Sequence, residues 1–89
     1  MVEVGIGDQL RSATGGNPLL SVDAVTVAEA VSRADEQYPG FRKEVVSSSG
    51  RIRESIRIAR VSDGADLDLD SVLVNGERIT VMRAALAGG

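Results

Sequence analysis

The chain has 89 residues, of which 43% are hydrophobic, and a formal net charge of −3. This length supports one domain, near the size at which a single core suffices without disulfides. Cysteine and histidine are absent, which excludes disulfides and thiolate chemistry and removes the usual general base and commonest metal ligand. We therefore expect no bound metal and no self-sufficient hydrolase. Since Tyr38 and Phe41 are the only aromatic residues, the core must consist of Val, Leu, Ile and Ala.

Composition also limits the partners. No apolar run reaches the roughly 20 residues of a membrane span, and Glu3 and Asp8 interrupt any signal-peptide pattern. We expect a soluble cytoplasmic protein that does not contact a membrane. The acidic net charge and the shortage of aromatic side chains for base stacking disfavour nucleic acid as a partner.

The first third of the chain predicts a β-hairpin. Residues 1–6 alternate between apolar and other side chains, as in a half-buried strand. The cluster of turn residues at 14–18 precedes a second predicted strand at 19–24. Gly5-Ile6-Gly7 begins like a dinucleotide-binding fingerprint, but no third glycine or helix follows, so this interpretation is rejected.

A helix is predicted to follow the hairpin. Thr26 and Glu29 form a capping box, in which the Thr26 hydroxyl accepts from the Glu29 amide and the Glu29 carboxylate reaches back to the Thr26 amide. Pro39-Gly40 ends the helix. One amphipathic stripe runs along it, made of Val27, Val31, Ala34 and Tyr38.

The remainder predicts a short helical turn at 41–46, a long strand at 51–61 and a closing strand at 78–82. In the long strand, isoleucines occupy one face and arginines the other; these are Ile52, Ile56 and Ile58 against Arg51, Arg53 and Arg57. Asn75-Gly76 is a strong turn signal before the closing strand.

Residues 66–70 are acidic, and we expect Leu67 and Leu69 to cover an edge of the core. Three aspartates here, together with Glu77, match several ligand positions of an EF-hand loop. Ser71 stands where that loop needs glycine and flanking helices are missing, so a solvated acidic loop is favoured over calcium binding.

The order of strand, strand, helix, short helix, strand and strand predicts an α+β fold. We expect a mixed sheet of four to five strands crossed by one main helix. The domain spans residues 1–83, and residues 84–89 form a flexible tail that ends in Gly88-Gly89. Glycine tolerates almost any backbone angle, so such a tail suits a narrow enzyme channel that reaches the Gly89 carboxylate. A frayed end without function is the alternative.

Several motifs together resemble those of the MoaD/ThiS/CysO-type bacterial sulfur-carrier proteins, which have the ubiquitin-like β-grasp fold. The resemblance spans nearly the whole chain. It rests on Leu10-Arg11, Thr14-Gly15-Gly16, Thr26-Val27-Ala28-Glu29-Ala30, Tyr38-Pro39-Gly40-Phe41, Asn75-Gly76-Glu77, Ile79-Thr80-Val81 and Ala85-Leu86-Ala87-Gly88-Gly89.

This resemblance implies a carrier protein rather than an enzyme. An activating enzyme would use ATP to adenylate the Gly89 carboxylate, and a sulfur donor would convert it to a thiocarboxylate for a sulfur-accepting synthase. No trimming would be needed, because the chain already ends on Gly89, and no cofactor would be bound. The implied partner surface is the exposed sheet face near the tail, with candidate residues Arg53, Arg57, Met82, Arg83, Ala85, Leu86 and Ala87, and Arg51 beside them.

Three alternatives stay open. The arginines can instead be a solvated strand face. The same activated Gly89 would serve a protein modifier that is joined to lysines of its targets, although the single Lys43 argues against chains built on itself. The third is a plain interaction module whose tail has no role.

Overall fold

The computed structural model describes residues 1–84, so the predictions for the last five residues, Ala85 to Gly89, lie outside the described part and stay predictions. Its strands are β1 (Val2–Ile6), β2 (Leu19–Val22), β3 (Ile56–Arg60) and β4 (Arg78–Arg83). Its helices are a 3-10 helix, η1 (Asp8–Thr14), and two α-helices, α1 (Val27–Gln37) and α2 (Phe41–Val45).

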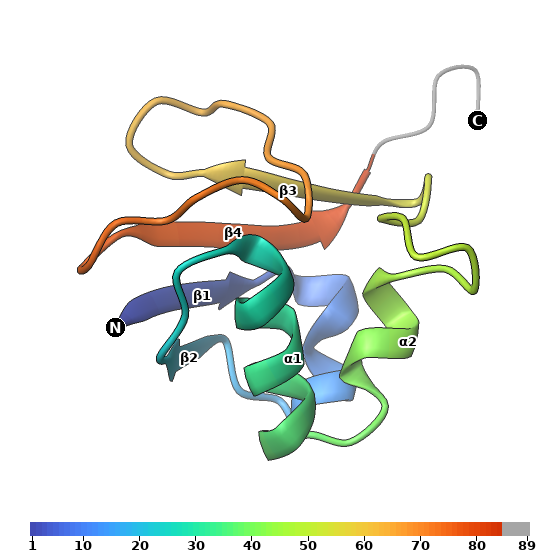
Figure 1. Ribbon diagram of the computed structural model, residues 1–89. Coiled ribbons are helices and arrows are strands. Elements are labelled where there is room, and N and C mark those ends of the chain that lie inside the picture. Colours follow the sequence, from blue (N-terminus) through green and yellow to red (C-terminus); the bar gives the residue numbers. More distant parts are fainter. Residues whose placement is uncertain (85–89) are drawn as a thin grey trace.

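The four strands form one mixed sheet in the order β2-β1-β4-β3. β1 is antiparallel to β2 and parallel to β4, and β3 is antiparallel to β4. Figure 1 shows the helices gathered on one face of this sheet. The α+β prediction, with a mixed sheet and one main helix, is confirmed.

The core lies between the sheet and the helices. β1 buries alternate residues, Val2, Val4 and Ile6, as the sequence pattern predicted. The sole phenylalanine, Phe41, is fully buried at the start of α2. The remaining core side chains are almost all aliphatic, and the largest cluster members from the other elements are Leu10, Leu20, Val27, Val31, Val45, Ile58, Ile79 and Val81.

The predicted cap of α1 is present, with one difference. The Thr26 hydroxyl accepts a hydrogen bond from the Glu29 amide at 3.2 Å. The Glu29 carboxylate accepts from the Val25 amide at 3.0 Å, one residue before the expected donor. The carboxylate still satisfies a backbone donor at the helix start, so the helix begins where the sequence placed it.

Two predicted elements need correction. The connection between the first two strands contains η1, which buries Leu10 and Thr14. The third strand begins at Ile56 and not at residue 51. Ile52 instead forms an isolated bridge with Val46, and the Arg53 amide donates to the Val45 carbonyl at 2.8 Å. Residues 46–53 therefore fold back on the end of α2, and Arg51 and Arg53 do not lie on the arginine face of β3.

The acidic segment covers the outer edge of β3. The Leu67 amide donates to the Ile58 carbonyl at 2.8 Å, and the Arg60 amide donates to the Ala65 carbonyl at 2.9 Å. Leu67 is buried and Leu69 packs against the core, as predicted. This segment therefore covers an edge that would otherwise present unpaired backbone groups.

Candidate partner-docking face

The sheet face that bears no helix lies beside the end of the described chain. Along β4, Ile79 and Val81 are buried toward the helices, whereas Thr80 and Met82 alternate onto the open face. The register places Thr80 opposite Gly5 on one side, and Met82 opposite Arg57 on the other. Small side chains thus occupy the middle of this face, and Met82 and Arg57 mark the end near residue 84.

Two adjoining hollows follow this face. One, of about 290 Å³, is lined by Gly7, Asp8, Gln9, Met82, Arg83 and Ala84. A second, of about 590 Å³, shares Gly7 and Asp8 with the first and extends over Gly5 and Thr80. The open face is therefore concave where β4 ends, which gives a partner surface a place to bind next to Ala84.

Gly7 allows Met82, near the end of β4, to pack closely against the end of β1. A Cβ atom on Gly7 would lie 3.0 Å from the Cβ and 3.2 Å from the Cα of Met82. At Gly5 the corresponding nearest contact, with Thr80 Oγ1, is an ordinary 3.4 Å. The absence of a side chain at Gly7 therefore lets the end of β4 lie close to β1.

Backbone hydrogen bonds fix the end of β4 from both sides. The Gly7 amide donates to the Val81 carbonyl at 2.8 Å, and the Ala84 amide donates to the Ser55 carbonyl at 2.8 Å. The pairing with the β3 side thus continues one residue beyond β4. This ladder sets the position of Ala84, the last residue that the structure describes.

The structure divides the predicted arginines between two places. Arg57 lies on the open face, where it pairs with Asp66 and donates to the Gly64 carbonyl at 3.2 Å. Arg83 lies toward α2, with its guanidinium 3.9 Å from the Glu44 carboxylate. Arg53 also lies there, because its Nε donates to the Lys43 carbonyl at 2.8 Å. Of the predicted partner residues that lie within residues 1–84, only Arg57 and Met82 share the open face.

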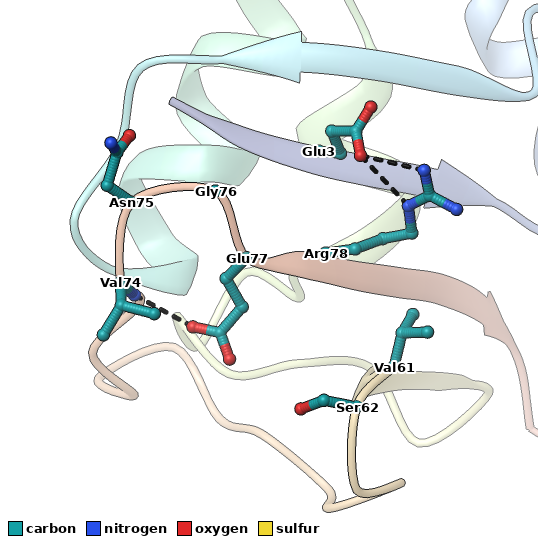
Figure 2. A pocket seen from close by; sticks show the side chains of 8 residues that line it. All are labelled: Glu3, Val61, Ser62, Val74, Asn75, Gly76, Glu77 and Arg78. Carbon is teal, nitrogen blue, oxygen red and sulfur yellow. Dashed lines mark hydrogen bonds and ion pairs between the residues drawn. The ribbon is translucent and has the colours of Figure 1, made fainter.

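The opposite end of β4 is held by charged side chains (Figure 2). Arg78 donates to Glu3 at 2.9 Å, and Glu77 accepts from the Val74 amide at 2.9 Å as well as from Arg60. The hydrogen bond to Glu77 raises the pKa of the Arg60 guanidinium above its ordinary value. Since these contacts hold the 74–77 turn at the end of the sheet away from Ala84, we assign them a structural role.

Asp63 belongs to the same end of the molecule. Its carboxylate accepts from the Ala65 amide at 3.0 Å and pairs with Arg60 at 3.3 Å. The hydrogen bond from Ala65 first, and the charge of Arg60 second, hold the pKa of this carboxyl below its ordinary value. Both contacts keep the 62–65 turn folded against β3.

Neither a metal cluster nor a membrane span is found within residues 1–84. No three carboxylates there are grouped so that they could hold a metal ion. Two members of the EF-hand-like pattern have other partners, Asp66 with Arg57 and Glu77 with Arg60. No helix in this part of the chain has the length and apolar character needed to cross a bilayer.

Sequence reasoning did not identify Gly7, Ser55 or the hollow beside Met82. The signal for Gly7 is slight: two glycines, Gly5 and Gly7, alternate on the non-core side of the first strand pattern. Nothing in the sequence marks Ser55 as the backbone partner of Ala84, because that contact depends on the register of β3 against β4.

No protein-family model and no curated protein matches this sequence. Solved structures do match it in fold. CysO in the BexX/CysO complex of Amycolatopsis orientalis superposes with a TM-score of 0.86 at 22% identity, covering 99% of this chain and 100% of that one. Mycobacterium tuberculosis CysO gives 0.80 at 25% identity, covering 96% and 100%. Small archaeal modifier protein 1 of Methanosarcina acetivorans gives 0.77 at 20% identity, covering 99% and 95%.

These likenesses define the class of protein: the chain has the ubiquitin-like β-grasp fold. Within that fold it is similar to CysO and to small archaeal modifier protein 1. The β-grasp fold that the sequence resemblance implied is confirmed, as is the likeness to CysO.

Proposed function

We propose that the chain is a small carrier or modifier protein, and more specifically a sulfur carrier that acts through the carboxylate of Gly89. The observation that carries the proposal is the combination of a CysO-like β-grasp fold over nearly the whole chain with a terminal Gly88-Gly89. The hollow beside Met82 supports it, because a partner that binds there covers Ala84, five residues before that carboxylate.

The proposed chemistry has two steps. A carboxylate oxygen of Gly89 attacks the α-phosphorus of ATP on an activating enzyme, and pyrophosphate leaves. Hydrosulfide from a sulfur donor then attacks the carbonyl carbon of the acyl-adenylate, the bond from that carbon to the AMP oxygen breaks, AMP leaves, and loss of the thiol proton gives the thiocarboxylate. The thiocarboxylate sulfur is a better nucleophile than the original oxygen, and a sulfur-accepting synthase would consume it in a biosynthetic pathway.

In this proposal the chain contributes shape and one reactive atom, while its partners contribute catalysis. It is not an enzyme, and ATP is bound by the activating enzyme. The lack of histidine and cysteine agrees with this division of roles. The open face at Met82 and Arg57 would bind the partner, as in a protein–protein interface with a small buried centre. We place this chemistry in the cytoplasm as part of the proposal.

A protein modifier is the second candidate, and one observation favours it. The chain shares its fold with small archaeal modifier protein 1 over 99% of its length. The same adenylate of Gly89 would then react with a lysine amine of a target, form an isopeptide bond and release AMP. The two candidates differ only in the nucleophile that attacks the activated carbonyl.

Intact-mass spectrometry of the protein from its native cells tests both candidates. The sulfur-carrier proposal expects a species heavier by one oxygen-to-sulfur exchange, located in the peptide that ends in Gly89. Deletion of Gly88 and Gly89 is the matched variant, which we expect to fold normally and to lose this species completely. Higher-mass conjugates without a thiocarboxylate would favour the modifier, and a wild-type protein without either product would refute both.

A further inference from the structure

The basic side chains of this chain are unevenly neutralised. Residues 41–54 carry four basic and two acidic side chains, whereas the rest of the chain carries six basic and eleven acidic ones. Six arginines elsewhere lie within 4.0 Å of a carboxylate, namely Arg11, Arg33, Arg57, Arg60, Arg78 and Arg83. Among residues 1–84, no such partner is found for the four basic side chains of 41–54, which are Arg42, Lys43, Arg51 and Arg53.

Three of these four lie in or beside α2, in a region that we call the basic corner: Arg42, Lys43 and Arg53. All three are exposed. The bond from Arg53 Nε to the Lys43 carbonyl brings the loop arginine to the α2 pair. Arg51 is set apart, because it lines a separate hollow together with Asp68 and Asp70.

The basic corner lies beside the point where β4 ends. Glu44, next to Lys43 on α2, is 3.9 Å from Arg83, the last residue of β4. Figure 1 shows α2, the loop after it and the end of β4 on the same side of the molecule. The corner is on the helix side of β4, whereas Met82 and Arg57 are on the open side. A partner that encloses the end of β4 would contact both.

Neighbouring carboxylates form no ion pair with these three side chains within residues 1–84. Glu44 is directed to Arg83, and the Asp35 carboxylate accepts from the Gly40 and Arg42 amides at 3.1 and 3.0 Å. Glu54 is exposed and forms no ion pair within residues 1–84. Capping of α2 explains the position of Arg53. It does not explain Arg42 and Lys43, whose side chains donate no hydrogen bond to the described residues.

We propose that the basic corner binds an acidic surface of the activating enzyme, beside the entrance through which that enzyme takes the tail. This inference rests on the proposed function. In a protein of net charge −3, a local excess of positive charge next to the end of β4 would orient the encounter so that this end of the molecule arrives first. Such charges change the association rate and its salt dependence more than the lifetime of the complex.

Two charge reversals of equal size test the proposal, Lys43→Glu in the corner and Arg33→Glu on the exposed side of α1. The probe is the activating enzyme of the same cells, recognised by its release of pyrophosphate from ATP with the wild-type protein. Association rates are measured by stopped-flow fluorescence at low and at high salt. We expect Lys43→Glu to slow association about three- to tenfold at low salt, and Arg33→Glu less than twofold. At about 1 M salt, where the screening length falls to about 3 Å, the difference should vanish.

Equal rates for the two variants at low salt would overturn the inference while leaving the proposed function intact. If the wild-type protein causes no release of pyrophosphate, both fail. A single-stranded oligonucleotide is titrated in parallel, and a loss of its binding in Lys43→Glu with unchanged enzyme association would assign the corner to nucleic acid instead. Thermal melts of both variants show whether each is folded, and a second corner variant, Arg42→Gln, replaces Lys43→Glu if that protein does not fold.

Discussion

The contact between Gly7 and Met82 gives a sharp test of how the end of β4 is held. The substitution is Gly7→Ala, directly after β1, and the matched control is Gly5→Ala, two residues earlier within β1. Gly7 has φ of −61° and ψ of 152°, a conformation that alanine adopts freely. Any cost of Gly7→Ala must therefore come from contacts and not from backbone strain.

The structure sets the size of the effect. The added Cβ at Gly7 would lie 3.0 and 3.2 Å from Met82 atoms and 3.4 Å from the Val81 carbonyl oxygen, and two of these three atoms belong to the backbone of β4. Overpacking of this kind costs about 1–3 kcal/mol of unfolding free energy. At Gly5 the nearest atoms are at 3.4 and 3.6 Å, so we expect a change within about 0.5 kcal/mol, with alanine slightly favoured in a strand.

Urea unfolding followed by far-UV circular dichroism measures both variants. Because Met82 precedes Ala84 by two residues, we also expect Gly7→Ala to raise the KM of the proposed activating enzyme for this protein, with kcat little changed. Equal unfolding free energies for Gly7→Ala and Gly5→Ala would refute the reasoning, since they would show that the end of β4 relaxes without cost.

Two further predictions concern the core and pH. Phe41→Ala removes a fully buried ring at the start of α2 and should lower the unfolding free energy by about 3–5 kcal/mol in urea titrations; a loss below 1 kcal/mol would mean that the site collapses around the vacancy. Asp63→Asn tests the lowered pKa of that carboxyl. Its stabilising contribution is present above the ordinary pKa of 3.8 and is lost as pH falls through the folded-state pKa, so wild type and variant should differ in stability at pH 7 and converge at strongly acidic pH. A difference that does not change with pH would refute this assignment.

Elements whose signals are local were predicted well. α1 depends on a capping hydroxyl at Thr26 and on an apolar stripe at helical spacing, and both act within a few residues. β1 and β4 depend on strict alternation, and the 74–77 turn depends on Asn75-Gly76. These signals do not require knowledge of what packs against them.

The elements that were wrong depend on distant partners. The isoleucine pattern continues back to Ile52, but Ile52 pairs with Val46 beside α2 and β3 begins four residues later. The periodicity was read correctly, since Ile52 does pack against the core, but the strand was extended too far. Likewise η1 is a short 3-10 helix, and runs of this kind have weak sequence signals because their stability comes mainly from packing.

The sequence alone predicted the class of chemistry, which stays a prediction. The absence of histidine and cysteine and the Gly88-Gly89 pair favour a carrier that reacts through the carboxylate of Gly89. The tertiary structure decided which of the candidate partner residues share a face. It brought Gly7 against Met82 and Ser55 against Ala84, and it separated Arg57 on the open face from Arg53 and Arg83 beside α2. The physical reason is that composition and periodicity are local properties of the chain, whereas the faces of a sheet are assigned by the register between strands distant in sequence.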